Sequence, residues 1–446
     1  MVYGVENERN EEYSYTFIAM HKKFRLRDIV HDALSTEKKR QQLLDRAHRP
    51  SRQLNDLGQI GVPLDQVAVH LDQGVSRPNV TRPRVGAEFA FVRLPYIDAF
   101  VLYSSNPDGI EQARQLLEPD YLVIPNVELA LSSPPIRNRL RRTGQRLTWP
   151  NESAIGEARR KGITGSGVLV GVLDTGCDAD HLEFRQKRVD FRYVSPLDPT
   201  TNSMRPVQGF DVDGHGTHVC GVIAGRNVGV ARDVTLMVAS VINSESLKTN
   251  LDRVAVGLDW MLARFENREN ISKPTIINMS LAFKLGSIAA PQVQNIMTAI
   301  TDLLDDLVAV DVLVVGAIGN DGPGTVQVPA CMPQVLSVGA VDWNLVVAPF
   351  SGGGVSSFTP DVQPDIIGYG VDVLSSLERD VDKDSWYTRI SGTSMATPYV
   401  TGIAALLAAA NPGLQGYGLR QRLISAALPL SGPRDRVGAG LARFVI

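Results

Sequence analysis

From residue 168 onward, short apolar runs alternate with helix-like segments, and this alternation restricts the possible folds more than any other feature. The apolar runs occupy residues 168–174, 234–242, 275–281, 312–319 and 335–341. Apolar residues recur at helical spacing between them, most clearly over 251–265 and 293–304. Strands that alternate with helices favour a parallel sheet with helices on both faces. We therefore predict an α/β domain of three layers, built on a mainly parallel sheet.

Two polar residues stand where such a sheet places functional groups. Asp174 ends the first apolar run, and Asn320 directly follows the fourth. In open α/β sheets, functional groups gather at the carboxyl ends of the strands. We expect both side chains at that edge, although an asparagine in a Gly-Asn-Asp-Gly turn also has a purely structural interpretation.

A serine and a histidine each stand at the start of an apolar helical segment. Ser394 follows Gly392, and Pro398 is interpreted as lying in the first turn of the helix, where its missing N–H is tolerated. His215 stands between two glycines. A serine hydroxyl needs a base to take its proton, and a carboxylate holds that base in one tautomer. Ser394, His215 and Asp174 can fill these roles, although a serine before a helix is most often only a cap.

These three motifs together resemble those of the subtilisin-like serine proteases, in the chain order Asp, His, Ser. The resemblance covers about residues 148–442 and includes the segments 277–287, 328–342 and 364–376. It implies a subtilisin-like catalytic domain over 143–446 that hydrolyses peptide bonds of protein or peptide substrates through an acyl-enzyme intermediate.

The family resemblance also implies roles for residues outside the three motifs. Asn320 corresponds to the asparagine that binds the oxyanion, together with the backbone N–H of Ser394. Ser280, Leu281 and Ala282 correspond to an edge strand that pairs with the substrate backbone. Without the family, these last three positions would be read as an ordinary strand end.

The first 142 residues divide into two segments of different character. Residues 1–85 are charged and heterogeneous, with a helix predicted within 25–49. Residues 86–142 contain a smaller α+β unit, with strands expected at 88–94, 99–105 and 121–131, followed by a basic linker. This unit resembles the inhibitory propeptides of the family, whose C-terminal tail lies in the substrate cleft in extended form. An unrelated accessory domain is the alternative.

The basic linker suggests where such a region would be removed. Arg141 and Arg142 stand at its end, just before the expected catalytic domain. Exposed, Pro-rich and basic segments are suited to proteolytic cleavage. Cleavage at this junction is a hypothesis that rests on position and expected exposure.

Three differences from the family pattern bear on cofactors and specificity. The segment after the His215 helix is shorter than in members that fold a calcium loop there, so we expect that calcium site to be absent and no cofactor to be required. The segment between Asn320 and Pro329 is also short. In the family it forms part of the pocket for the residue before the scissile bond, so the sequence does not predict a cleavage preference. Residues 341–358 are Gly-rich where the family has a strand and a turn.

The three cysteines do not form a disulfide framework, which fits a reducing compartment. Cys220 is interpreted as a small core residue, although its position on the His215 helix could make activity thiol-sensitive. A metal site built from Cys177, Cys220, Cys331 and His218 would need a convergence that their spacing does not predict.

Composition and the first residues restrict which binding partners and which cellular compartment we expect. The formal net charge of −3 gives no sign of a nucleic-acid surface, and no apolar run of about 18 residues predicts a membrane span. The first residues are acidic and polar rather than basic and then apolar, so we expect no secretory signal and a cytoplasmic location.

Two alternatives to a protease remain open at this point. The same acyl-enzyme could transfer its peptide to an amine, which would make the protein a transamidase or ligase. The N-terminal region could instead fill the cleft permanently, which would leave a latent scaffold or binding protein. No residue of the Asp, His, Ser set is lost, which argues against a dead enzyme but not against a latent one.

Overall fold

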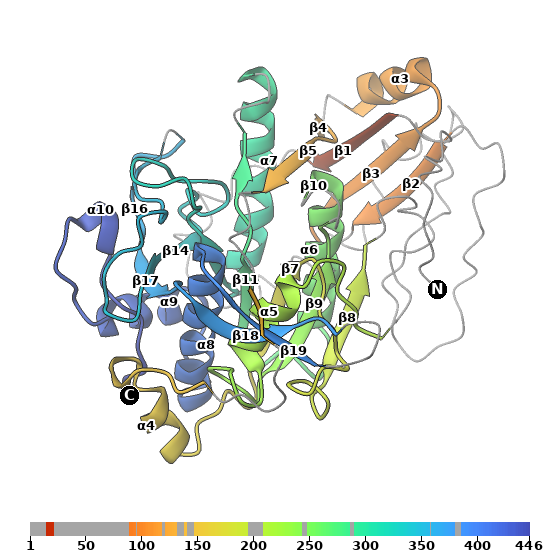
Figure 1. The fold of residues 1–446 in the computed structure, drawn as a ribbon. Coiled ribbons are helices and arrows are strands. Elements are labelled where there is room, and N and C mark those ends of the chain that lie inside the picture. Colours follow the sequence, from red (N-terminus) through yellow and green to blue (C-terminus); the bar gives the residue numbers. More distant parts are fainter. Residues whose placement is uncertain are drawn as a thin grey trace.

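The structure is a computed structural model of the chain (Figure 1). It describes residues 15–21, 89–94, 96–117, 121–131, 138–140, 147–194, 208–242, 248–285, 290–356, 358–379 and 385–446. The helix predicted within 25–49 and the Arg141–Arg142 junction lie outside the described residues.

The centre of the protein is a seven-stranded sheet in which every neighbouring pair is parallel. Its order is β17 (Ile366–Tyr369), β14 (Val335–Val341), β13 (Leu313–Ala317), β11 (Thr275–Met279), β7 (Leu169–Asp174), β9 (Thr235–Ser240) and β8 (Val189–Tyr193). All five predicted apolar runs form strands of this sheet. Asp174 pairs with Ser240, so the carboxyl ends of β7 and β9 meet at one edge.

Helices cover both faces of the sheet, which confirms the predicted three layers. One face packs against α5 (His215–Ala224), α8 (Thr393–Ala410) and α9 (Gly416–Ala426). The other face packs against α6 (Leu251–Phe265) and α7 (Ala290–Ala309). Successive residues of β7 alternate between the two cores: Val170 and Val172 face α5 and α8, whereas Leu169 and Leu173 face α6.

Helix α8 runs through the core. Among the described residues, it is the one helix whose length and composition would allow it to cross a membrane, and 83% of it is buried inside the protein. Burial on all sides explains why it is apolar around its whole circumference. Short helices complete the part of the chain expected to be catalytic, residues 143–446, which we call the catalytic part. They are α4 (Ile155–Arg160), α10 (Arg434–Val437) and the 3₁₀ turn η2 (Asn151–Ser153).

A smaller antiparallel sheet precedes the catalytic part. Its order is β2 (Phe89–Leu94), β3 (Ala99–Ser104), β1 (Tyr15–His21) and β4 (Tyr121–Pro125). One face packs against α3 (Pro107–Leu117) through a cluster of aromatic residues that includes Phe17, Phe91 and Phe100. The other face contributes Ile18, Val101 and other apolar residues to the same core as α6 and α7, beside which the sheet lies in Figure 1.

The segment 121–131, expected as one strand, is two strands with different partners. β4 pairs with β1, and β5 (Glu128–Leu131) leaves the small sheet to lie between β10 (Lys248–Asn250) and β12 (Phe283–Lys284). Both pairings of β5 are antiparallel. We refer to the described residues from β1 to β5 as the N-terminal unit.

The basic segment expected as an exposed linker also contains a strand. β6 (Asn138–Leu140) pairs with β19 (Trp386–Ile390), which in turn pairs with β18 (Val373–Leu377). The Gly-rich segment contains β15 (Gly354–Val355), which pairs with β16 (Val362–Gln363) just beyond it. Two strands that precede residue 143 are therefore part of sheets completed by the catalytic part.

Candidate active site

Asp174 and His215 meet at the carboxyl edge of the sheet, as predicted. Asp174 is the last residue of β7 and is fully buried. His215 is the first residue of α5, and its Nδ1 lies 2.8 Å from Asp174 Oδ1. Because a carboxylate only accepts hydrogen bonds, Nδ1 carries the proton and Nε2 is the basic nitrogen. Oδ1 also accepts a hydrogen bond of 2.7 Å from the backbone N–H of Thr175.

Glycines allow this close approach of helix and strand. Gly214, the residue before α5, has φ of +94°, and a Cβ there would lie 1.7 Å from Glu378 Oε2. A Cβ on Gly216 would lie 2.1 Å from the carbonyl oxygen of Gly176, in the turn after β7. A larger residue at either position would therefore separate His215 from Asp174 or strain the backbone.

Ser394 lies at the start of α8, in agreement with the prediction, but Pro398 does not lie in the first turn. Helix α8 begins at Thr393, so Pro398 is inside it. The prediction for Pro398 was wrong because the helix starts one residue before Ser394 rather than after it. Since proline has no N–H, the carbonyl of Ser394 lacks its usual partner four residues later. Ser394 itself is half-buried, whereas Thr393 and Met395 are fully buried.

Asn320 is joined to the residue before Ser394. Its Oδ1 accepts hydrogen bonds from the backbone N–H and the hydroxyl of Thr393, at 2.9 and 3.0 Å. Because the amide oxygen is engaged there, the two N–H donors on Nδ2 are left for another acceptor. Thr393 Oγ1 in turn accepts from the backbone N–H of Gly319 at 3.3 Å. These bonds place Asn320 next to the N-terminus of α8 and orient its amide.

Ser280, Leu281 and Ala282 connect β11 to β12 and are all buried, at 3, 3 and 4% exposure. Ser280 Oγ accepts a hydrogen bond of 2.8 Å from Asn278 Nδ2. The segment then runs into β12, which is paired with β5 of the same chain. Their predicted role as substrate contacts stays a prediction.

The N-terminal unit is held to α6 by two buried carboxylates. Asp259 Oδ1 accepts hydrogen bonds from the backbone N–H groups of Tyr96 and Ile97, at 2.7 and 3.1 Å. Asp252 Oδ2 accepts from the hydroxyl of Tyr103 at 2.9 Å. Burial raises the pKa of Asp252, which marks its carboxylate as strongly desolvated. These contacts, together with the shared apolar core, fix the unit to the catalytic part.

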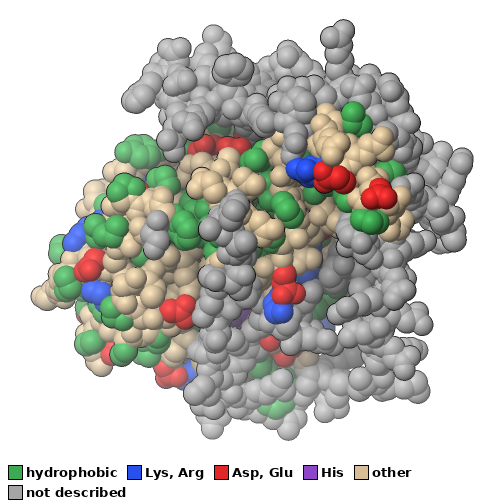
Figure 2. Space-filling model, turned by 90° about the horizontal axis from the view of Figure 1, so that it is seen from above, with side chains coloured by type: hydrophobic (Ala, Val, Ile, Leu, Met, Phe, Trp, Pro, Cys, Tyr) green, Lys and Arg blue, Asp and Glu red, His purple; other side chains and the backbone are tan. Residues whose placement is uncertain are grey.

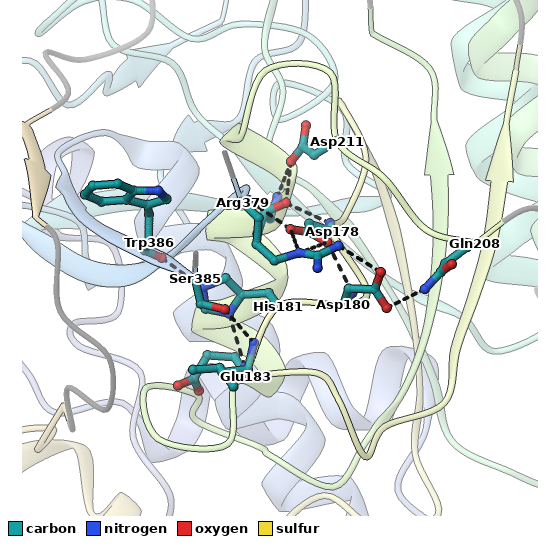
Figure 3. Close-up of polar contacts among 11 residues, drawn as sticks. Asp178, Asp180, His181, Glu183, Gln208, Asp211, Arg379, Ser385 and Trp386 are labelled. Atoms are coloured by element: carbon teal, nitrogen blue, oxygen red, sulfur yellow. Dashed lines mark hydrogen bonds and ion pairs between the residues drawn. The ribbon is translucent and has the colours of Figure 1, made fainter. Parts of the chain in front are cut away.

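A polar network behind the Asp174 turn was missed in the sequence (Figure 3). The guanidinium of Arg379 contacts Asp178 at 2.9 Å and Asp180 at 2.8 Å. The backbone N–H of Asp178 donates to Thr217 Oγ1, and Thr217 is bound in turn to Asp211 Oδ2 at 2.6 and 2.7 Å. Asp211 thus binds the first turn of α5. The network ties the turn after Asp174 to the helix that begins with His215.

His181, in the same network, must be neutral for its hydrogen bonds to form. Its Nε2 lies 2.9 Å from the carbonyl oxygen of Trp386, to which it donates, and its Nδ1 accepts from the backbone N–H of Glu183 at 3.1 Å. Protonation would replace the acceptor at Nδ1 by a donor. Burial is the main cause that lowers the pKa of His181.

We therefore predict that protonation of the unfolded chain destabilises the fold as the pH falls. The folded pKa lies below the ordinary value of about 6.5, so below that pH the unfolded state binds the proton first and stability decreases. Urea unfolding between pH 8 and 5, in a Ser394→Ala background, measures this slope. His181→Gln should flatten it over the same range. An identical slope in the two proteins would contradict the prediction.

The cysteines lie in the protein interior and are not paired in disulfides. Cys177, Cys220 and Cys331 are each 0% exposed and free. Burial, with a smaller contribution from the neighbouring Cys177, raises the pKa of Cys220, so its thiol is unreactive. The interpretation of Cys220 as a small core residue is confirmed. His218, also buried on α5, contacts the carbonyl oxygen of Val373 through Nε2 at 3.0 Å.

This chain is similar in sequence to a known protein family and to several known proteins. The family model described as the subtilase family matches residues 165–440. The subtilisin-like protease PopC of Myxococcus xanthus (strain DK1622) is 43% identical over 376 residues, which are 81% of this chain and 78% of PopC. Alkaline elastase YaB of Bacillus sp. (strain YaB) is 35% identical over 64% of this chain and 65% of its own length. Subtilisin Savinase of Lederbergia lenta is 33% identical over 64% of this chain and 91% of its own length. The family match includes Asp174, His215, Asn320 and Ser394.

Proposed function

The chain belongs to the subtilase family of serine proteases, and from this premise we propose that it is an endopeptidase whose catalytic residues are Asp174, His215 and Ser394. The observation that carries the assignment is the hydrogen bond of 2.8 Å between His215 Nδ1 and Asp174 Oδ1, which directs the basic Nε2 away from the carboxylate. Membership of the family makes the protein a hydrolase that acts on proteins or peptides; the residue roles are the proposal.

In the proposed reaction, Ser394 Oγ attacks the carbonyl carbon of the scissile bond while His215 Nε2 takes the hydroxyl proton. His215 then donates that proton to the leaving amine, and water hydrolyses the acyl-enzyme by the same route in reverse. Asp174 stabilises the imidazolium that forms in both steps. Asn320 Nδ2 and the backbone N–H of Ser394 donate to the oxyanion, where one donor contributes about 10²- to 10³-fold in rate.

The N-terminal unit restrains the enzyme in this proposal. Support comes from β5, which occupies the position between β10 and β12 as the central strand of three. A strand in that position takes the main-chain hydrogen bonds that an extended substrate would need. The residues just before β12, Ser280 to Ala282, are buried while the unit is in place. Release of the unit would therefore be required before a substrate strand could bind there.

Restraint by the N-terminal unit predicts that a weaker contact with α6 speeds access to Ser394. Tyr103→Phe removes the hydroxyl that Asp252 binds, and a hydrogen bond to a charged group contributes about 1.5–3 kcal/mol. We expect labelling of Ser394 by a fluorophosphonate probe to become about tenfold faster in the full chain, because more of the protein is open at equilibrium. A time course of labelling, resolved on gels, measures this rate.

Tyr417→Phe is the matched control, since Tyr417 is 68% exposed on α9. A chain that lacks residues 1–142, refolded with that region supplied in trans, gives the upper limit of labelling. Equal rates in all forms would reduce the N-terminal unit to an accessory role. No labelling of any folded form would favour a latent scaffold. The masses of the products from a defined peptide test the reaction type: if their sum lacks the mass of one added water, peptide transfer is favoured over hydrolysis.

The proposal requires no metal ion, in line with the short segment after α5. Glu183, near that segment, uses its carboxylate on protein donors: Asn227 N–H at 2.7 Å, Asn227 Nδ2 at 3.0 Å and the Tyr387 hydroxyl at 2.7 Å. A carboxylate saturated in this way has less capacity left for a cation. Calcium elsewhere in the chain stays open to measurement.

A further inference from the structure

A cavity of about 670 Å³ lies at the edge of the sheet opposite the candidate active site. It is bounded by residues 182–188, by Arg226 after α5 and by residues 232–235 at the start of β9. The far end of β9 is Ser240, which pairs with Asp174. Five residue steps along a strand separate the two ends of β9 by about 16 Å, so the cavity is distinct from the Asp174–His215 pair.

Cationic side chains dominate the lining of this cavity. It contains five of them, Arg185, Lys187, Arg188, Arg226 and Arg232. Only two acidic residues line it, so the formal excess is three positive charges, in a chain whose net charge is −3. On the face seen in Figure 2, by contrast, described acidic and basic side chains lie in small groups of both signs. The cavity is a local concentration of positive charge that the composition does not predict.

The two acidic residues only partly offset these five cations. Glu183 is 1% exposed, and its oxygens accept hydrogen bonds from Asn227 and Tyr387 behind the cavity wall. Asp233 is exposed to solvent and contributes one negative charge to the lining. Within the described part of the chain, no ion pair engages the guanidinium groups of Arg185, Arg188 or Arg226.

Lys187 is a partly buried cation of this lining. Its ammonium donates to the carbonyl oxygen of Arg232. Burial is the first cause that lowers its pKa, and the charges of Arg232 and Arg226 lower it further, against the opposing effects of Asp233 and Glu183. A bound anion would offset both the burial and the repulsion among these cations.

We propose that this cavity binds a compact polyanion of the phosphate class, either a free oligophosphate or a small phosphate ester. Its volume lies in the range of small-molecule sites. The planar fork of a guanidinium matches phosphate oxygens in a bidentate manner. Four arginines belong to the lining of this cavity. Nucleic acid and membrane surfaces are recognised by extended basic faces, whereas these charges line one concave site.

The test uses the full-length Ser394→Ala protein, so that its result does not depend on the proposed catalytic roles. Isothermal titration calorimetry with inorganic tripolyphosphate should show saturable binding of about one ligand per chain. Arg185→Gln combined with Arg188→Gln should weaken that binding at least tenfold, because each guanidinium would supply charge-assisted hydrogen bonds. Arg226→Gln alone, in a different segment of the lining, should also weaken it.

Arg268→Gln is the matched control, because Arg268 is exposed and lies outside the lining of the cavity. It removes one positive charge, as Arg226→Gln does, and should leave the affinity unchanged. Thermal unfolding verifies that each variant is folded, which the exposure of Arg185, Arg188 and Arg226 favours. Absence of saturable binding, equal weakening by Arg268→Gln, or unchanged affinity in the cavity variants would overturn the proposal. Tighter binding of RNA or of anionic vesicles than of tripolyphosphate would also overturn it.

Discussion

Replacement of Ser394 by alanine is expected to reduce turnover of a peptide substrate by about 10⁶-fold, a magnitude known for subtilisin itself and not obtained from this structure. The variant keeps Asp174, His215 and Asn320 in place but has no hydroxyl to attack the carbonyl. Ser394 is half-buried in the first turn of α8, and among the described residues no hydrogen bond that holds α8 in place involves its Oγ. The fold should therefore be retained, with a melting temperature close to that of the wild type.

The measurement is the rate of cleavage of a fluorogenic peptide, after the N-terminal unit has been released, together with fluorophosphonate labelling. Ser425→Ala on α9 is the matched control, since Ser425 is exposed and its hydroxyl donates to the carbonyl oxygen of Arg422 within its own helix. Retained proteolysis in the folded Ser394→Ala protein would refute the assignment of the nucleophile. Loss of activity in both variants would point to a preparation that does not fold.

The central sheet could be predicted because its inner strands are buried on both faces. Such strands form continuous apolar runs, and all five predicted runs are inner strands. The two strands that were not predicted, β17 and β8, are the two edges of the sheet. β8, with the sequence VDFRY, mixes charged and apolar residues because one of its sides has no neighbouring strand.

The N-terminal unit contains a strand that local sequence patterns did not predict. β2 and β3 follow each other closely and were predicted, whereas β1 lies in the charged first segment and was not. β1 is nevertheless the inner strand between β3 and β4, and its partner Ser104 is 89 residues away from Tyr15. Only the three-dimensional pairing distinguishes this strand from other short apolar stretches in a charged region.

The reactive groups of the candidate site were predictable, but the groups that hold them were not. Asp174, His215 and Ser394 each stand in a motif with its own glycines, so chemistry and spacing identified them. Arg379 and Asp178 are 201 residues apart and carry no motif. The same holds for Asp259 and Ile97, which are 162 residues apart. Supporting contacts of this kind are selected by geometry alone, and several residue types could make them.

Under the proposed triad, replacement of Asp174 by asparagine is expected to reduce turnover by about 10⁴-fold, a loss known for the corresponding change in a serine protease with an established Asp-His-Ser triad. The side-chain size is preserved, but the negative charge that stabilises protonated His215 is lost. Hydrogen bonding adds a second effect. If the amide oxygen keeps its contacts with Thr175 and His215, the new NH₂ group takes the place of Oδ2, which is buried and accepts no hydrogen bond from a described residue.

The other orientation of the introduced amide is no better for catalysis. It would set the NH₂ group against the backbone N–H of Thr175 and would donate to His215 Nδ1, which moves the ring proton to Nε2. His215 in that tautomer cannot take the proton of Ser394. Peptide cleavage rates at a pH where the wild type is fully active measure the loss, with exposed Asp372→Asn as the matched control. Turnover within tenfold of the wild type in the folded Asp174→Asn protein would mean that His215 does not depend on this carboxylate, and the proposed triad would have to be abandoned even if Ser394 is the nucleophile.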